Sequence, residues 1–174
     1  MRKAVTGIES PYLSLVIDAD YLTVGEIGNI LIRLQAVLRI LVDLSRSRRE
    51  QPRFIVKIMK SRRHWEILVL LSILSLTAAI PQNLDFYREV AGRAFTKLKL
   101  AIIALAENRG FTVEVNKGEL DLKLAHELLD GLSPRQRKKL GDFALALTRP
   151  ANCIVIREDA LEVTIKPAQP PRLI

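Results

Sequence analysis

The sequence predicts an α+β fold, with a mixed sheet of about four strands and helices packed mainly on one face of it. Short apolar runs of strand length recur along the chain, and long stretches between them carry an apolar stripe at i, i+3, i+4, i+7 spacing. The chain also ends in two apolar runs joined by a tight turn. The predicted order is β-α-β-α-α-β-α-α-β-β in a single domain over residues 1–166, followed by a proline-rich tail at 167–174.

The first strand is expected at residues 13–17, where apolar side chains on both faces are typical of a central strand. Thr23 and Glu26 form a capping-box pattern, because each side chain can accept a hydrogen bond from the backbone amide of the other. An amphipathic helix is expected to follow and to run to about Ser45. Its apolar stripe comprises Ile27, Ile30, Leu31, Leu34, Leu38, Leu41 and Val42.

A second strand is expected at residues 54–59, after a basic loop that contains Pro52. Alternation along this strand predicts one wetter face, formed by Ile55, Lys57 and Met59. A strand, a helix and a strand in this order predict a right-handed βαβ crossover with parallel strands. The run 65–80 is almost entirely apolar and is expected to be a helix that ends before Pro81.

A third helix is expected from about Leu84, capped by Asn83, to Asn108, with Gly110 in the left-handed position beyond its end. Residues 111–115 alternate as a strand. The segment 119–130 is ambiguous. The alternating leucines in its first part predict a strand, whereas the spacing of the leucines in its later part predicts a helix. Its shortage of β-branched residues favours the helix.

A second capping box, Ser133 to Gln136 with proline at the first helical position, begins the last helix. The buried side of this helix is expected to comprise Leu140, Phe143, Ala144 and Leu147. Residues 154–156 and 161–165 flank a tight turn and predict a terminal β-hairpin.

Composition limits the chemistry available to this chain. The 174 residues carry 27 Lys and Arg against 19 Asp and Glu, a net charge of +8 that favours acidic partners, nucleic acid or anionic surfaces. The single cysteine, Cys153, excludes an intramolecular disulfide and multi-cysteine zinc sites. With His64 and His126 as the only histidines, we expect no metal and no cofactor. The N-terminus lacks the apolar run of a secretory signal, so a cytoplasmic protein is expected.

Residues 16–23 read Val-Ile-Asp-Ala-Asp-Tyr-Leu-Thr, which resembles the first motif of haloacid-dehalogenase-type phosphatases. The resemblance implies that Asp18 attacks phosphorus and that Asp20 handles the proton of the leaving group. It also implies a magnesium-binding acidic pair, but the nearest candidate, Asp142, falls inside a predicted helix. We therefore expect Asp18 and Asp20 to be turn residues, whose carboxylates interact favourably with the N-terminus of the following helix. A phosphatase ranks third among the functions.

A basic stretch runs through residues 46–63 and ends beside His64 and Trp65. Cations next to a ring that can stack on a base are the ingredients of a nucleic-acid site, although a solvated loop has the same composition. The candidate residues for this second-ranked function are Arg46, Arg48, Arg49, Arg53, Arg62 and Arg63. Lys57 and Lys60 lie in the same basic stretch.

The apolar run 65–80 is about 16 residues long, whereas a membrane span needs about 20, so insertion is disfavoured without being excluded. A helix that is apolar all round is either enclosed in the fold or half covered by another subunit. The candidate interface residues are Trp65, Leu70 and Leu74.

The first half of the chain is similar to a group of uncharacterised bacterial proteins. The matching features are the strand 13–17, the motif Tyr-Leu-Thr-Val-Gly-Glu at 21–26, the long helix 27–45 and the segment 54–80. The order of elements also resembles the N-terminal domain of TRADD-type adaptors, a likeness of fold that implies no site.

These observations predict a non-enzymatic module for protein interaction or self-assembly, of the kind found in bacterial defence or signalling systems. Convergent polar residues that could support catalysis are missing from the patterns above. The expected partner is a second copy of the chain or another protein, because the apolar helices offer more surface than a small sheet can cover.

Overall fold

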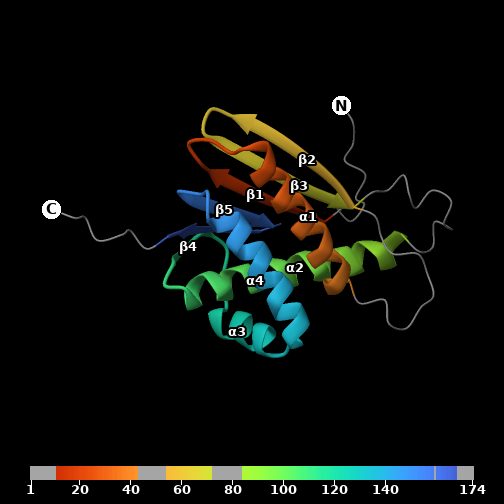
Figure 1. The fold of residues 1–174 in the computed structure, drawn as a ribbon. Coiled ribbons are helices and arrows are strands. Elements are labelled where there is room, and N and C mark those ends of the chain that lie inside the picture. Colours follow the sequence, from red (N-terminus) through yellow and green to blue (C-terminus); the bar gives the residue numbers. More distant parts are fainter. Residues whose placement is uncertain (1–10, 43–53, 72–83, 159, 168–174) are drawn as a thin grey trace.

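A computed structural model describes residues 11–42, 54–71, 84–158 and 160–167, and confirms the α+β class (Figure 1). Four helices and six strands are described in it. In chain order they are β1 (Tyr12–Asp18), α1 (Val24–Leu41), β2 (Phe54–Ser61), β3 (His64–Leu71), α2 (Leu84–Asn108), β4 (Thr112–Lys117), α3 (Leu122–Asp130), α4 (Pro134–Thr148), β5 (Cys153–Glu158) and β6 (Leu161–Lys166).

The strands form one sheet in the order β2-β3-β1-β5-β6-β4, in which every neighbouring pair is antiparallel. The sheet therefore has six strands where about four were expected, and it is not mixed. β1 and β2 run in the same direction, as the predicted crossover through α1 requires, but they do not pair, because β3 lies between them and is antiparallel to both.

The helix expected over 65–80 is also wrong, because residues 64–71 form β3. Ile67, Val69 and Leu71 are buried on one face of this strand, and the residues between them point to the other face. β3 carries apolar residues on both faces, with Leu68 and Leu70 on the second face, so it lacks the alternation of a half-buried strand and resembles a buried helix in sequence. Residues 72–80 lie outside the described residues.

The predicted helix signals are confirmed where the structure describes them. The Glu26 amide donates to Thr23 Oγ1 at 3.1 Å and the Thr23 amide to Glu26 Oε2 at 2.8 Å, so the first capping box is formed. The second box, at Ser133 and Gln136, is formed in the same way. Gly110 has φ +81° beyond the end of α2. The ambiguous segment contains the helix α3. α1 ends at Leu41, because the backbone of Val42 is extended, and not at about Ser45 as expected. Asn83 lies outside the described residues.

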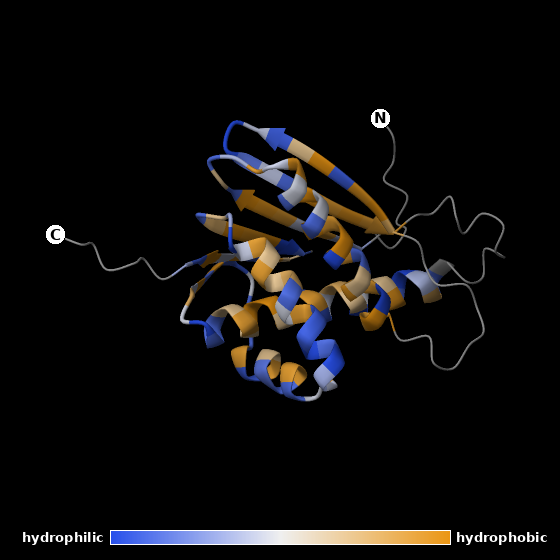
Figure 2. Cartoon of the chain, in the orientation of Figure 1, coloured by the Kyte–Doolittle hydropathy of each residue, from blue (hydrophilic) through white to orange (hydrophobic). Residues whose placement is uncertain are grey.

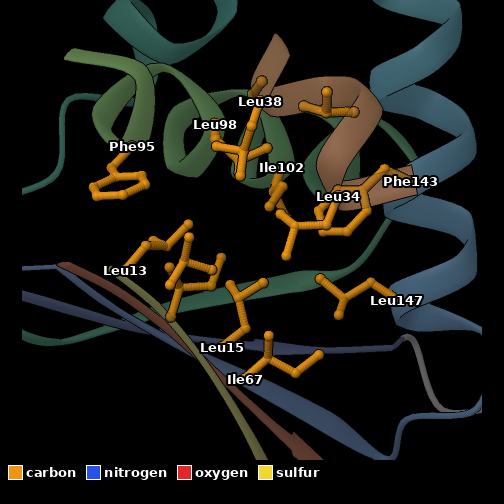
Figure 3. Close-up of a cluster of buried hydrophobic side chains, with 14 of the residues drawn as sticks. Leu13, Leu15, Leu34, Leu38, Ile67, Phe95, Leu98, Ile102, Phe143 and Leu147 are labelled. Atoms are coloured by element: carbon orange, nitrogen blue, oxygen red, sulfur yellow. The ribbon is translucent and has the colours of Figure 1, made fainter. Parts of the chain in front are cut away.

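The core lies between one face of the sheet and the helices α1, α2 and α4. Figure 3 shows side chains of β1 and β3 below, pointing toward side chains of the three helices above them. The expected buried side of α4 is confirmed, and the terminal β5–β6 hairpin forms as predicted. α3 packs on α2 in a separate small cluster of Leu100, Ala104, Ala125 and Leu129.

No helix in the described ranges is long and apolar enough to cross a lipid bilayer.

Candidate functional site

β2 is one of the two edge strands of the sheet and pairs only with β3 in the described part of the chain (Figure 1). It is an eight-residue strand in which hydrophobic residues are interrupted by two lysines (Figure 2). Four of its hydrophobic side chains are exposed: Ile55 by 37%, Val56 by 39%, Ile58 by 42% and Met59 by 46%.

The four exposed side chains are divided between the two faces of β2. Val56 lies opposite Val69 of β3 in the register, and Ile58 lies opposite Ile67, so both point to the face that the helices cover. Val69 and Ile67 are 0% and 3% exposed, whereas their neighbours on β2 are about 40% exposed. The helical layer therefore covers β3 and stops short of β2.

Ile55 and Met59 point to the other face, opposite Leu70 and Glu66. Only the beginning of β2 is held by a helix, through the ring of Phe54, whose centroid is 5.5 Å from that of Phe95 on α2. The rest of the strand combines a backbone edge that no described strand pairs with and apolar side chains on both of its faces.

The opposite edge of the sheet, β4, is built differently. It has six residues, and its register against β6 is interrupted by a bulge between Val115 and Lys117. Glu114 of β4 and Lys166 of the neighbouring β6 form an exposed ion pair at 3.7 Å. Bulges, short length and charges protect an edge strand from pairing with other chains. β2 pairs with β3 without interruption along its whole length, so Lys57 and Lys60 are its only such features.

The turn between β2 and β3 is anchored to the end of β1. The Ala19 amide donates to the carbonyl of Arg63 at 3.0 Å. The guanidinium of Arg63 lies 2.7 Å from Asp20 Oδ1 and 3.8 Å from Asp18 Oδ1. Arg62, its neighbour in the two-residue turn, has φ +53°, a conformation that usually requires glycine or asparagine. The hairpin is thus held at its tip while its outer edge is open.

Asp18 and Asp20, the residues of the phosphatase-like motif, lie at this anchor. Across the sheet, Asp18 lies between His64 and Cys153, and the Cys153 thiol donates to Asp18 Oδ2 over 3.9 Å. Burial, and then the Asp18 carboxylate, raise the pKa of Cys153, so the sulfur stays a thiol at neutral pH. Within the described ranges no group of three or more His, Cys, Asp or Glu is placed to hold a metal ion.

The structure separates the interface residues expected from the sequence. Trp65 points to the helix-covered face, where it is half-buried against the core, with the Lys60 ammonium 4.6 Å above its ring. Leu70 lies five residues along the strand and points to the other face. Leu74 lies outside the described residues. These residues therefore do not share one face, as they would on a helix.

The expected nucleic-acid residues are only partly described. Arg62 and Arg63 form the exposed turn between β2 and β3, and the guanidinium of Arg63 is engaged by Asp18 and Asp20. The others, Arg46, Arg48, Arg49 and Arg53, lie outside the described residues.

Sequence reasoning did not single out the exposed residues of β2. Their alternation predicted a strand with one wetter face. The available signal was Ile55 and Met59, which make the expected wet face apolar as well. A strand that is apolar on both faces and carries isolated lysines is consistent with an edge that meets a partner.

No protein-family model matches this chain, and neither a curated protein nor a solved structure matches it.

Proposed function

We propose that this chain is a non-enzymatic module for protein interaction or assembly, which binds a partner by adding a strand to the free edge of β2. The observation that supports this proposal is the exposure of Ile55, Val56, Ile58 and Met59 on both faces of an uninterrupted edge strand.

Strand addition uses two features that β2 combines. In an antiparallel ladder, about half the residues of an edge strand direct their N–H and C=O groups outward, where they are available to another strand. Main-chain hydrogen bonds to these groups supply affinity, and side chains on alternating faces supply specificity. Val56 and Ile58 would pack on one face of the added strand, and Ile55 and Met59 on the other.

The test compares two variants that add the same charge at an exposed isoleucine. Ile58→Lys places an ammonium group in the middle of the β2 edge, whereas Ile32→Lys places one on α1, where Ile32 is 69% exposed. Circular dichroism should show native structure for both, because neither side chain is part of the core. Tagged wild-type and variant chains are cross-linked in the cells of their source, and the cross-linked proteins are quantified by mass spectrometry.

We expect cross-linked partners to be lost from Ile58→Lys and retained by Ile32→Lys. Equal cross-linking of the two variants, or none with the wild type, contradicts the proposal.

A second candidate function, binding of nucleic acid, is favoured by a basic cluster at the start of α4. Arg135, Arg137 and Lys138 are exposed, Lys139 is half-buried, and none of the four has an ion-pair partner in the described part of the chain. Positive charges near the N-terminus of a helix interact unfavourably with the helix dipole, so these four cations do not stabilise α4.

Fluorescence anisotropy with short single- and double-stranded DNA and RNA tests this candidate. Replacing Arg135, Arg137 and Lys138 with Gln should weaken binding and lower the log–log salt slope by roughly one per lost phosphate contact. Absence of binding at low salt removes the candidate.

A further inference from the structure

We propose that the strand which occupies the β2 edge is β2 of a second copy of this chain. The two strands run antiparallel about a two-fold axis normal to the sheet, with Ile58 of one copy opposite Ile58 of the other. This inference rests on the proposed function, and it adds the identity of the partner and the register of the contact.

A two-fold contact joins β2 to β2 and leaves β4 unused, and no described strand pairs with the outer edge of β2. A contact of this kind joins the same surface of both copies and closes the assembly at two chains. A head-to-tail contact would instead place β2 of one copy against β4 of the next. The bulge between Val115 and Lys117 and the charges of β4 oppose regular pairing there.

The symmetry limits the registers that β2 can adopt. A two-fold axis normal to the sheet keeps the helices of both copies on the same side, so residues that face each other must belong to the same face of the strand. In each such register one residue lies directly opposite its own copy, and the register is centred on that residue. Centring on Lys57 or on Ile58 pairs seven residues of β2, whereas centring on Val56 or on Met59 pairs five, all counted within the strand bounds 54–61.

Charge decides between the two longer registers. Centring on Lys57 places Lys57 directly opposite its own copy, and like charges in that position are destabilising. Centring on Ile58 places Lys57 opposite Met59 and Lys60 opposite Val56, so each lysine faces an apolar residue of the other chain. The methylenes of Lys57 can cover Met59 of the other chain while its ammonium group stays in water, and the Lys60 ammonium lies over Trp65 of its own β3, away from the edge.

This register also covers the exposed apolar residues on both faces. On the helix side, Val56 and Ile58 of the two copies form one continuous strip between the two helical layers. On the other side, Ile55 and Met59 of each copy lie along the same junction. The result is a single twelve-stranded antiparallel sheet, twice the six strands of one chain.

Light scattering coupled to size-exclusion chromatography tests the identity of the partner, and single cysteines test the register. In a Cys153→Ser background, Ile58→Cys should form an intermolecular disulfide under mild oxidation, because directly opposed residues lie within disulfide range. Val56→Cys is the matched control: its two copies would be offset by four residues along the strand and too far apart to bond. Lys57→Cys reports the competing register.

We expect the wild type to have twice its 19.6 kDa chain mass, Ile58→Lys to be monomeric, and the disulfide to form at position 58 alone. A dimer that cross-links at position 57 overturns the register. A monomeric wild type that still loses cross-linked partners in the Ile58→Lys variant overturns the second copy and leaves the proposed function standing. A monomeric wild type whose associations are unaffected by Ile58→Lys overturns both.

Discussion

Arg62 is the residue at which the backbone departs most from ordinary geometry, since among the described residues it is the one non-glycine with a positive φ, at +53°. For an L-residue the left-handed region costs roughly 1–2 kcal/mol, and glycine adopts it freely. The turn beside the β2 edge therefore holds an arginine at a cost in stability.

We expect Arg62→Gly to raise the free energy of unfolding by about 1 kcal/mol, because relief of the left-handed strain exceeds the added entropy of the unfolded chain. Urea denaturation measures the change. Arg63→Gly is the matched control: Arg63 has no positive φ and pairs with Asp20, so this variant should lose stability. A loss of stability in both variants would show that no strain is stored at position 62.

Cys153 gives the fold a pH dependence of known sign. Burial and the nearby Asp18 carboxylate raise the pKa of its thiol above the ordinary value of 9.0. A group whose pKa is higher in the folded state stabilises the fold below its unfolded pKa, and that stability is lost as the pH rises through the folded pKa. The contribution of Cys153 should therefore decline above about pH 9.

The measurement is the difference in unfolding free energy between wild type and Cys153→Ser, followed from pH 7 to pH 10.5. We expect the advantage of the wild type to shrink across the upper part of this range. A constant difference at all pH values would contradict the raised pKa.

At the scale of elements, the parts of the fold that could be predicted are those fixed by nearby residues. Thr23 with Glu26 and Ser133 with Gln136 satisfy backbone amides within one turn, so their helices could be predicted from spacing alone. β3 could not, because its strand state depends on pairing with β1 and β2, and pairing leaves no mark in the sequence of β3 itself. A run that is apolar on both faces gives no local period to distinguish a strand from a buried helix.

A buried ion pair joins α2 to β5. Lys99 and Glu158 are in contact with side-chain exposures of 9% and 12%, and the Thr96 hydroxyl donates to Glu158 Oε1 at 2.7 Å. Removing one partner leaves an unpaired charge in a poorly solvated place, which typically costs 3–5 kcal/mol, whereas replacing both with apolar residues can be close to neutral.

We expect Lys99→Met to lower the free energy of unfolding by about 3 kcal/mol, and Lys99→Met with Glu158→Leu to recover most of that loss. Denaturation of the single and double variants completes the cycle. If the double variant is as unstable as the sum of the two single variants, the charges are not coupled.

At the scale of the whole molecule, the candidate site could be anticipated only in part. Residues 54–59 were identified as a strand, but whether a strand lies at an edge is a property of sheet order, which the sequence does not state. The sequence favours the more apolar run that follows as an interface, but Trp65 and Leu70 of that run point to opposite faces of an internal strand. In sequence the lysines of β2 belong to a basic stretch that resembles a nucleic-acid site, although lysine is also typical of edge strands.

The net charge of +8 per chain separates the two candidate functions by their response to salt. Two copies of a basic chain repel each other at long range, and salt screens that repulsion. We therefore expect self-association to strengthen between 50 and 300 mM NaCl, measured by light scattering, while binding to nucleic acid would weaken over the same range. Self-association that falls steeply with salt would contradict an apolar contact at β2.

The most direct test of the central claim is amide hydrogen exchange, compared at dilute and concentrated protein for the two edge strands. Peptides covering β2 should gain protection as the chain associates, because their outward amides become hydrogen-bonded to the second copy. Peptides covering β4, the protected edge, should exchange at the same rate in both conditions. Protection that rises on β4, or β2 amides whose exchange is independent of concentration while light scattering reports a dimer, would contradict pairing at the β2 edge.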